Sequence, residues 1–216
     1  MPIILWQFAQ AGAAISPGYA IAKELAKMCV EQYEFNVLTG VGAGIAQGSC
    51  WAAVATMPGP GFPAESAVTT AAPLGTTGAL LPYGAVFGNS RMASIRTRVP
   101  VPGLVGAGGF NAVSNHAERN TLLVASNNGL ALYADPALAI GGFAHYVLFV
   151  QLAPCVPCMA WLANGAKNPV AATIAPGGPA TLHVWYRWPY PAGGGAMWTW
   201  NALPRANKLT DIDNNW

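Results

Sequence analysis

The chain has 216 residues, of which 53% are hydrophobic and 8% are charged, and its formal net charge is +2. A chain of this length can bury a core without disulfides, and its four cysteines do not make a disulfide framework. The small net charge does not by itself indicate nucleic-acid binding. The longest uncharged run, 35–64, is broken by glycines and prolines, so we expect no stable membrane insertion.

The N-terminal part combines an apolar start, one helical pattern and a stretch of small residues. The opening MPIILWQFAQAGAAIS lacks the basic segment of a secretory signal. We therefore expect no cleavable signal peptide, and a location in the cytoplasm or, after secretion or injection, in a target cell. Residues 17–35 have apolar side chains at helical spacing, which predicts an amphipathic helix. Residues 40–82 are rich in Gly, Ala, Thr and Pro. We interpret 1–84 as a helical and Gly/Ala-rich extension, with membrane interaction or translocation as the alternative role of 36–85, and 85–216 as the principal domain.

The pattern changes to strand-like segments and turns in the second half of the chain. Residues 83–103 predict one or two strands. A helix is expected over 115–126, capped by Ser114 or Asn115 and ended by the sequence NNG. Residues 144–153 form a nearly continuous apolar run, which is typical of a central strand buried on both faces.

The segments that follow complete the predicted fold. Pro154 ends the strand, and CVPCMAWLANG at 155–165 predicts a short helix. The strand-like runs 168–176 and 181–190 are separated by GGPA, which is too short for a parallel crossover and therefore predicts an antiparallel hairpin. We expect an α/β fold with a mixed sheet of about five strands between helices. The tail 191–216 is left unassigned.

Two short motifs supply the donor atoms of a hydrolytic metal site. His116, Cys155 and Cys158 offer one imidazole and two thiolates, which hold Zn²⁺ and leave its fourth position for water. A C-x-x-C pair at the start of a helix presents both sulfurs to one point, and the helix end lowers the thiol pKa. Glu118 can take a proton from the water and return it to the substrate. Taken alone, H-A-E is a common surface helix fragment, and C-x-x-C is typical of structural zinc or thiol–disulfide exchange.

The pairing of HAE at 116–118 with PCVPC at 154–158 resembles the H-x-E and P-C-x-x-C signature of the cytidine deaminase-like superfamily, over about residues 85–190. The resemblance implies a three-layer α/β/α fold and a zinc-activated hydroxide that attacks C4 of cytosine or C6 of adenine. It also implies that His116, Cys155 and Cys158 are zinc ligands, that Glu118 is the proton shuttle, and that Ala117 and Pro154 border the substrate pocket.

The predicted terminal hairpin resembles the branch of that superfamily that contains free cytidine deaminases and many bacterial toxin deaminases. The transfer RNA adenosine and APOBEC-type branch instead has a helix between its last two strands. Residues 119–153 make a long gap between the motifs, and the extension and the aromatic tail are further departures from compact nucleoside deaminases. We therefore favour deamination of cytosine to uracil in DNA or RNA by a bacterial toxin-like enzyme, for which an immunity protein would be a partner. The alternatives are a deaminase of free cytidine or adenosine and a non-catalytic, zinc-stabilised nucleic-acid-binding module.

Several other residues are candidates for substrate contact. Asn111 and Asn115 could hydrogen-bond the sugar or base, although Asn115 is also suited to capping the helix. Phe110 could stack on a base or pack in the core. Aromatic residues and Arg187 alternate over 185–190, a composition suited to stacking on bases.

The remaining arginines, histidines and cysteines have simpler interpretations. Four arginines near the histidine motif favour a phosphate-bearing substrate or are solvated surface residues: Arg91, Arg96, Arg98 and Arg119. We expect structural roles for His145 and His183, a core position for Cys29, and a chemically inert Cys50.

Overall fold

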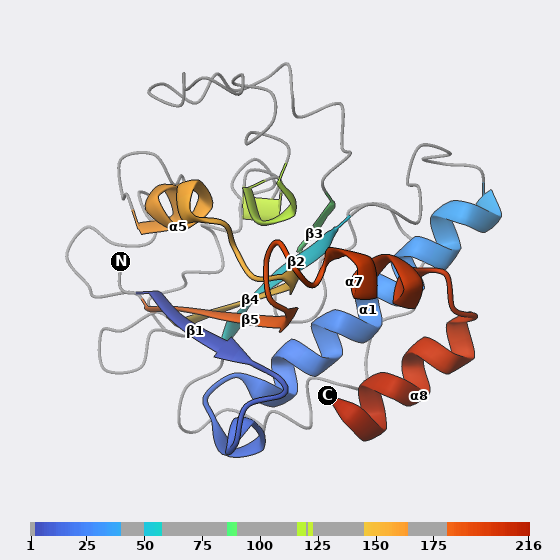
Figure 1. Ribbon diagram of the computed structural model, residues 1–216, viewed down its shortest axis with the longest axis horizontal. Coiled ribbons are helices and arrows are strands. Elements are labelled where there is room, and N and C mark those ends of the chain that lie inside the picture. The colour runs from blue at the N-terminus through green and yellow to red at the C-terminus, as the bar shows by residue number, and fades with distance from the viewer. Residues whose placement is uncertain are drawn as a thin grey trace.

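The fold is taken from a computed structural model, which describes residues 3–39, 50–57, 86–89, 116–119, 121–122, 145–163 and 181–216. These residues form one mixed sheet of five strands with helices on both faces (Figure 1). The strands lie in the order β1-β5-β4-β2-β3. Their bounds are β1 Ile3–Gln7, β2 Trp51–Met57, β3 Val86–Asn89, β4 His145–Leu152 and β5 Thr181–Trp188.

Strand β4 is the centre of the sheet, as its apolar run predicts. Residues 146–151 are all buried, because β5 pairs with one edge of β4 in parallel and β2 with the other edge in antiparallel orientation. Successive side chains of β4 enter opposite layers. Val147 and Phe149 belong to one apolar cluster, and Leu148 and Val150 to the other. The sheet is therefore buried on both faces.

Helices cover both faces of the sheet. On one face lie α1 (Tyr19–Thr39), α7 (Gly194–Asn201) and α8 (Arg205–Asn215). On the other lie α5 (Val156–Ala163) and the helical residues 117–119 and 121–122, which are drawn in green in Figure 1. We name this last segment the HAE helix. Among the described residues, no helix is long and apolar enough to cross a membrane.

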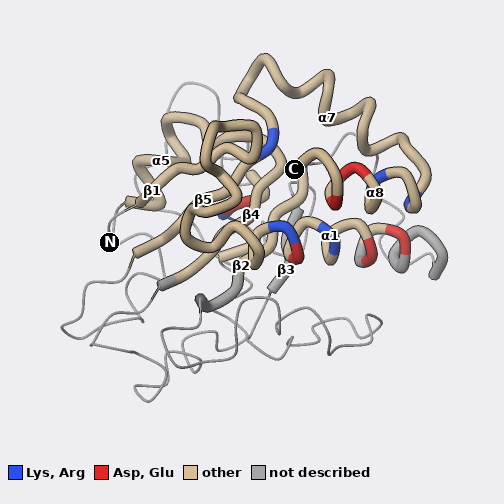
Figure 2. The backbone as a smooth tube through the Cα atoms, turned by 90° about the horizontal axis from the view of Figure 1, so that it is seen from below, with Lys and Arg blue, Asp and Glu red and all other residues tan. Residues whose placement is uncertain are grey.

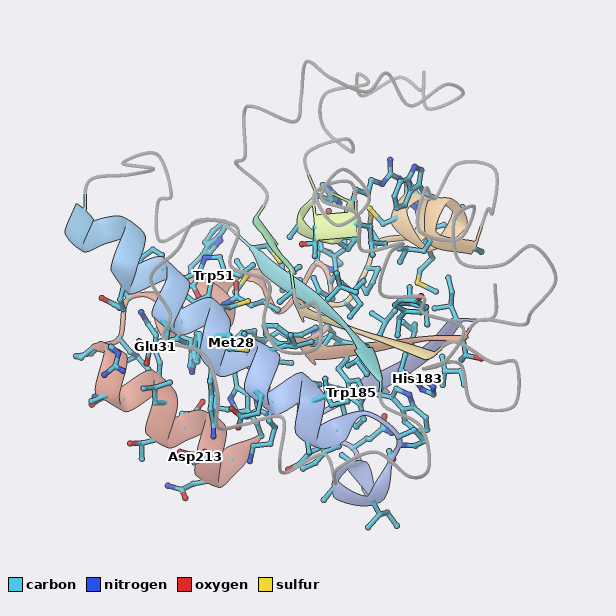
Figure 3. The ribbon with its side chains drawn as sticks, turned by 180° about the vertical axis from the view of Figure 1, so that it is seen from behind. Met28, Glu31, Trp51, His183, Trp185 and Asp213 are labelled. Carbon is cyan, nitrogen blue, oxygen red and sulfur yellow. The ribbon has the colours of Figure 1, made fainter. Side chains whose placement is uncertain are left out.

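Helices α1 and α8 pack side by side and carry most of the described charge (Figures 2 and 3). Arg205 donates to Glu31, Lys208 lies 3.2 Å from Glu34, and Lys27 lies 2.7 Å from Asp213. Apolar side chains of α1 pack against the sheet, where Trp51 and Trp185 belong to the same cluster. The helix predicted over 17–35 is confirmed, and it extends to residue 39.

The N-terminal part is integral to the sheet, so the expected division at residue 84 does not separate two folding units. Strand β1 pairs in parallel with β5, and β2 pairs with β4. Both strands lie within the segment that was interpreted as an extension. A short apolar segment at the start of a chain resembles any other apolar segment. Only its pairing with β5, in which Ile3 lies opposite Leu182, reveals its role.

The antiparallel pairing is also found at a different place from the one predicted. Strand β5 is parallel to both of its neighbours, β1 and β4, so both of its edges are occupied and no hairpin partner pairs with it. The segment 168–176 lies outside the described residues. The antiparallel pair at one end of the sheet is instead formed by β2 and β3.

The C-terminal tail forms α7 and α8, and its tryptophans complete the core under the sheet. Trp200 and Trp216 pack against each other with ring centroids 5.2 Å apart, and Trp188 contacts both. Trp185 is fully buried, and Arg187 lies over the ring of Trp216. The aromatic cluster proposed as a base-stacking surface is therefore mostly covered. The N-terminal part packs against Trp185, and the tail packs against Arg187 and Trp188.

Candidate metal centre

The two cysteines of PCVPC lie where the central strand leads into a helix. The backbone N–H of Ala153 donates to the carbonyl of Trp188, which extends the parallel pairing of β4 and β5 by one residue. The chain then turns into α5, where the N–H of Met159 donates to the carbonyl of Cys155. This arrangement places Cys155 and Cys158 at the carboxyl ends of parallel strands, where α/β proteins commonly bind ligands.

The histidine motif is held against the same end of the sheet by the HAE helix. The N–H of Arg119 donates to the carbonyl of His116, which forms the first helical turn. Ala117 and Leu122 are buried in the cluster that includes β4 and β5, and Thr121 Oγ1 donates to the carbonyl of Ala52 on β2. The apolar side of the HAE helix thus fixes the position of His116 and Glu118.

Four side chains from these two segments converge. Donor atoms of His116, Glu118, Cys155 and Cys158 all lie within 4.8 Å of one another. His116 Nδ1 is 3.4 Å from Cys155 Sγ, 3.3 Å from Cys158 Sγ and 3.8 Å from Glu118 Oε1. The residues that the sequence assigned to a metal site are brought together, and this group could hold a metal ion.

The four members of the cluster differ in their exposure to solvent. Cys158 is fully buried, and the Glu118 residue is 4% exposed. The side chain of His116 is 28% exposed, and Cys155 is partly exposed. The group is therefore exposed to solvent at His116 and Cys155, which we call its open side, whereas Glu118 and Cys158 are buried.

The mutual contacts shift the pKa of each member. Hydrogen bonding with Cys158 lowers the pKa of Cys155 to about 4, whereas the same contact and burial raise the pKa of Cys158 far above its usual value. Contacts with Cys155 and Glu118 raise the pKa of His116 to about 9. Burial tends to raise the pKa of Glu118, but contacts with His116 and Cys158 outweigh it and lower that pKa. A metal ion would bind the imidazole in its neutral form and the sulfurs as thiolates, so metal binding would release protons from the group.

Arg119 has a structural position that the sequence did not predict. It is fully buried, so its guanidinium does not meet a phosphate at the surface. Its Nη2 donates to the carbonyl of Pro157 at 2.8 Å, and the guanidinium lies 5.4 Å from the ring of Trp161. Arg119 therefore connects the HAE helix to the turn between the two cysteines. In the sequence, only its place directly after H-A-E indicated that Arg119 belongs near the site.

Tyr190 is a further residue at the open side. Its ring centroid is 6.4 Å from that of His116, at an interplanar angle of 51°, and the residue is 49% exposed. The sequence placed Tyr190 at the end of a strand, but β5 ends at Trp188, and Tyr190 lies in the turn that follows. This turn, and not a strand face, brings an exposed aromatic ring next to the cluster.

The other predicted site residues have mixed outcomes. Ala117 and Pro154 are buried beside the cluster. Phe110, Asn111 and Asn115 lie outside the described residues.

The remaining histidines and cysteines were interpreted as structural. His183 is buried and accepts a hydrogen bond from Trp6 Nε1, which confirms its structural interpretation. Cys29 is buried in the core as expected. Burial, with the nearby charge of Glu118, raises the pKa of Cys50 to about 12, so its thiol stays protonated as an inert group would. The side chain of His145 is not described.

The described fold and cluster define an α/β protein with a His/Glu/Cys/Cys group suited to a metal ion. The chain matches no protein-family model, and neither the curated proteins nor the solved structures gave a significant match. The function is therefore inferred from the site itself.

Proposed function

We propose that this protein is a zinc-dependent nucleobase deaminase that converts cytosine to uracil in DNA or RNA. The observation that carries the proposal is the convergence of His116, Cys155 and Cys158 with the buried carboxylate of Glu118. The resemblance of the two motifs to those of the cytidine deaminase-like superfamily supports the same conclusion.

The donor set fits zinc. One imidazole nitrogen and two thiolate sulfurs are typical ligands of a catalytic zinc ion, and they leave one coordination position for water. Zn–S and Zn–N bonds of usual length at a tetrahedral angle place nitrogen and sulfur about 3.6 Å apart. The measured separations of 3.3 and 3.4 Å are close to this value. Magnesium and calcium prefer oxygen ligands and do not suit this group.

Glu118 is suited to proton transfer at neutral pH. Bound zinc would supply a hydroxide by lowering the pKa of its water to about 7. The Glu118 carboxylate lies 3.8 Å from His116 Nδ1, so it would lie beside the metal and could accept a proton from the bound water. The carboxylate is buried next to His116 and Cys155, where it could pass this proton to the ring nitrogen. It could then pass a second proton, from the hydroxyl added to the ring carbon, to the amine that leaves as ammonia.

The surroundings favour this chemistry over thiol–disulfide exchange. A redox C-x-x-C pair needs one nucleophilic thiolate and a resolving thiol, and it does not need an imidazole in contact with both sulfurs and a carboxylate beside it. The aromatic ring of Tyr190 next to His116 offers a stacking surface for a flat heterocycle. The family resemblance covers both cytosine and adenine, and the hairpin that favoured the cytosine branch is not part of the described sheet. The choice between the two bases is therefore made by the experiment that follows.

The test is the pattern of base changes in cells that express the protein, because C-to-T and A-to-G changes distinguish the two target bases. Purified protein is then incubated with oligonucleotides, cytidine, deoxycytidine and adenosine. Turnover of nucleosides without turnover of oligonucleotides would favour a metabolic deaminase.

Two variants separate metal binding from catalysis. Glu118→Gln should retain zinc and the fold while turnover falls by about 10²–10⁴. Cys155→Ser should lose zinc by elemental analysis. Full activity of Glu118→Gln, or purified protein without zinc, would contradict the proposal.

A further inference from the structure

The outer edge of β1 is a strand edge built from apolar residues. β1 lies at one end of the sheet, beyond β5, which is its only partner among the described strands (Figure 1). Its sequence is IILWQ, in which Ile4 and Leu5 are 39% and 41% exposed. An open edge of this kind can pair with a strand of another chain. Proteins often prevent such pairing with charged residues or proline on the edge, and β1 contains neither.

The hydrogen bonds at the end of β1 show which backbone groups point outward. The N–H of Phe8 donates to a carbonyl of β5. The N–H of Gln7 instead donates to Gln10 Oε1, and the carbonyl of Gln7 accepts from the N–H of Gln10. Because the backbone of a strand repeats every second residue, the N–H and C=O groups of Ile3 and Leu5 also point away from β5. Gln10 therefore satisfies one end of this edge, and the outward groups of Ile3 and Leu5 have no partner among the described residues.

Exposed side chains on both faces of this edge indicate which kind of element could cover it. Successive side chains of a strand point to opposite faces, so Ile4 and Leu5 lie on different faces of the sheet. The described helices thus leave both faces partly open at β1. A helix docked on one face would cover only one of the two side chains, whereas a further strand in the plane of the sheet would cover both and would pair with the backbone.

A second copy of β1 matches the unpaired groups. When two copies lie antiparallel about a two-fold axis through Ile4, Ile3 of each copy lies opposite Leu5 of the other. Residues opposite each other whose groups point toward the partner exchange two N–H···O=C bonds. The two Ile3–Leu5 pairs would therefore use all the outward groups of these residues in both copies, and the groups that Gln10 already binds are not needed. Ile4 would face Ile4 of the second copy, in a pair without hydrogen bonds, where side chains approach closely.

The absence of charge also suits this pairing. The first charged side chain in the sequence is Lys23, so β1 and its connection to α1 carry none. A two-fold axis through the strand brings its side chains close to their equivalents in the other copy, and a charged residue there would meet a like charge. In β1 the facing side chains are isoleucine and leucine, which would bury each other.

We propose that this protein forms a two-fold dimer in which the β1 edges of two copies pair antiparallel about Ile4 and join the two sheets into one. The axis is perpendicular to the joined sheet, so α5 of both copies lies on the same face. Because β1, β5 and β4 are parallel, the metal clusters lie at opposite ends of the joined sheet, and neither blocks the other. The inference does not depend on the proposed deaminase function.

Charged substitutions at Ile4 test the axis. Ile4→Lys places two ammonium groups opposite each other in the dimer, and Ile4→Glu places two carboxylates there. Each variant alone should raise the dissociation constant of the dimer by about a hundredfold or more, because facing like charges repel. An equimolar mixture should form a mixed dimer, in which an ammonium group faces a carboxylate. Sedimentation velocity between about 1 and 100 μM measures the mass, which should be twice 22.3 kDa for the wild-type protein.

Two further variants separate the edge from its surroundings. Ile15→Lys is the matched control, because Ile15 is 91% exposed on the 3-10 helix Ala13–Ile15, between β1 and α1, and it should leave the dimer intact. Leu5→Pro removes an outward N–H but none of the bonds to β5, so it should abolish the dimer without adding charge. Thermal unfolding verifies that each variant folds, and Leu5→Pro decides the result if the charged variants do not fold.

Three outcomes would overturn the inference. A wild-type protein that is monomeric over this concentration range would leave the edge to an extended strand of another protein. A dimer that persists in Leu5→Pro or Ile4→Lys would have its contact elsewhere. Monomeric Ile4→Lys and Ile4→Glu variants that stay monomeric when mixed would refute the axis through Ile4.

Discussion

Gly18 provides a sharp test of how the N-terminal part docks on the central strand. It has φ +77° and precedes α1, where the N–H of Ala22 donates to its carbonyl. A Cβ atom added at Gly18 would lie 2.7 Å from Val147 Cγ2 and 3.4 Å from Trp185 Nε1. Val147 is fully buried on β4, so it cannot move aside freely. Gly18→Ala should therefore destabilise the protein through both backbone and packing.

The magnitude follows from three contributions. The left-handed backbone costs a residue with a side chain about 1–2 kcal/mol, and overpacking in a core costs about 1–3 kcal/mol. The loss of unfolded-state entropy on replacing glycine offsets about 0.4–1 kcal/mol. We expect Gly18→Ala to lower the free energy of unfolding by about 2–4 kcal/mol.

Gly12 is the matched control. It has φ +76°, and an added Cβ atom would meet nothing within 4 Å. Gly12→Ala should therefore cost only the backbone contribution, about 1 kcal/mol after the entropic offset. Urea unfolding followed by tryptophan fluorescence measures both variants. With an m value of about 2–3 kcal/mol/M, a loss of 3 kcal/mol lowers the midpoint by about 1–1.5 M. Equal losses for the two variants would refute the packing of Gly18 against Val147.

Three further perturbations test the site, the C-terminal core and the domain organisation. Chelation should lower the thermal midpoint, and Zn²⁺ but not Mg²⁺ should restore it, because nitrogen and sulfur ligands suit zinc; an unchanged midpoint would count against a folded-state metal site. Asp211 accepts hydrogen bonds from Trp200, Trp216 and Asn215, which outweigh its partial burial and lower its pKa. Asp211→Asn should cost about 1–2 kcal/mol at pH 7. This difference should begin to fade as the pH falls below the usual carboxyl value of 3.8, and it should be lost below the lowered pKa of folded Asp211; a difference independent of pH in acid denaturation would contradict the role of the charge. Residues 85–216 expressed alone should lack a cooperative unfolding transition, because β1, α1 and β2 are missing. A fragment that is folded by circular dichroism would instead support the interpretation of 1–84 as a separate extension.

Segments with a strong local pattern could be predicted from the sequence. Residues 146–150 before Pro154 are apolar at every position, so neither face of this strand was suited to exposure and β4 was predicted to be central. The helical spacing of apolar residues over 17–35 likewise predicted that one face of α1 packs against the core, as it does. The two motifs identified the metal cluster because imidazole and paired thiols in this order have few other uses, and the side chains of His116, Cys155 and Cys158 do converge.

Tertiary structure alone decided which segments complete the sheet and its surfaces. Ile3–Gln7 is too short for its pattern to show a strand, and it becomes one by pairing with β5. That pairing occupies the edge on which a hairpin was expected. The N-terminal part of the chain covers Trp185 and the tail covers Trp188, whereas the turn after β5 exposes Tyr190 beside His116. Periodicity reports which side chains are apolar within one segment, but the partner that covers them lies far away in the chain, and only the folded arrangement shows it.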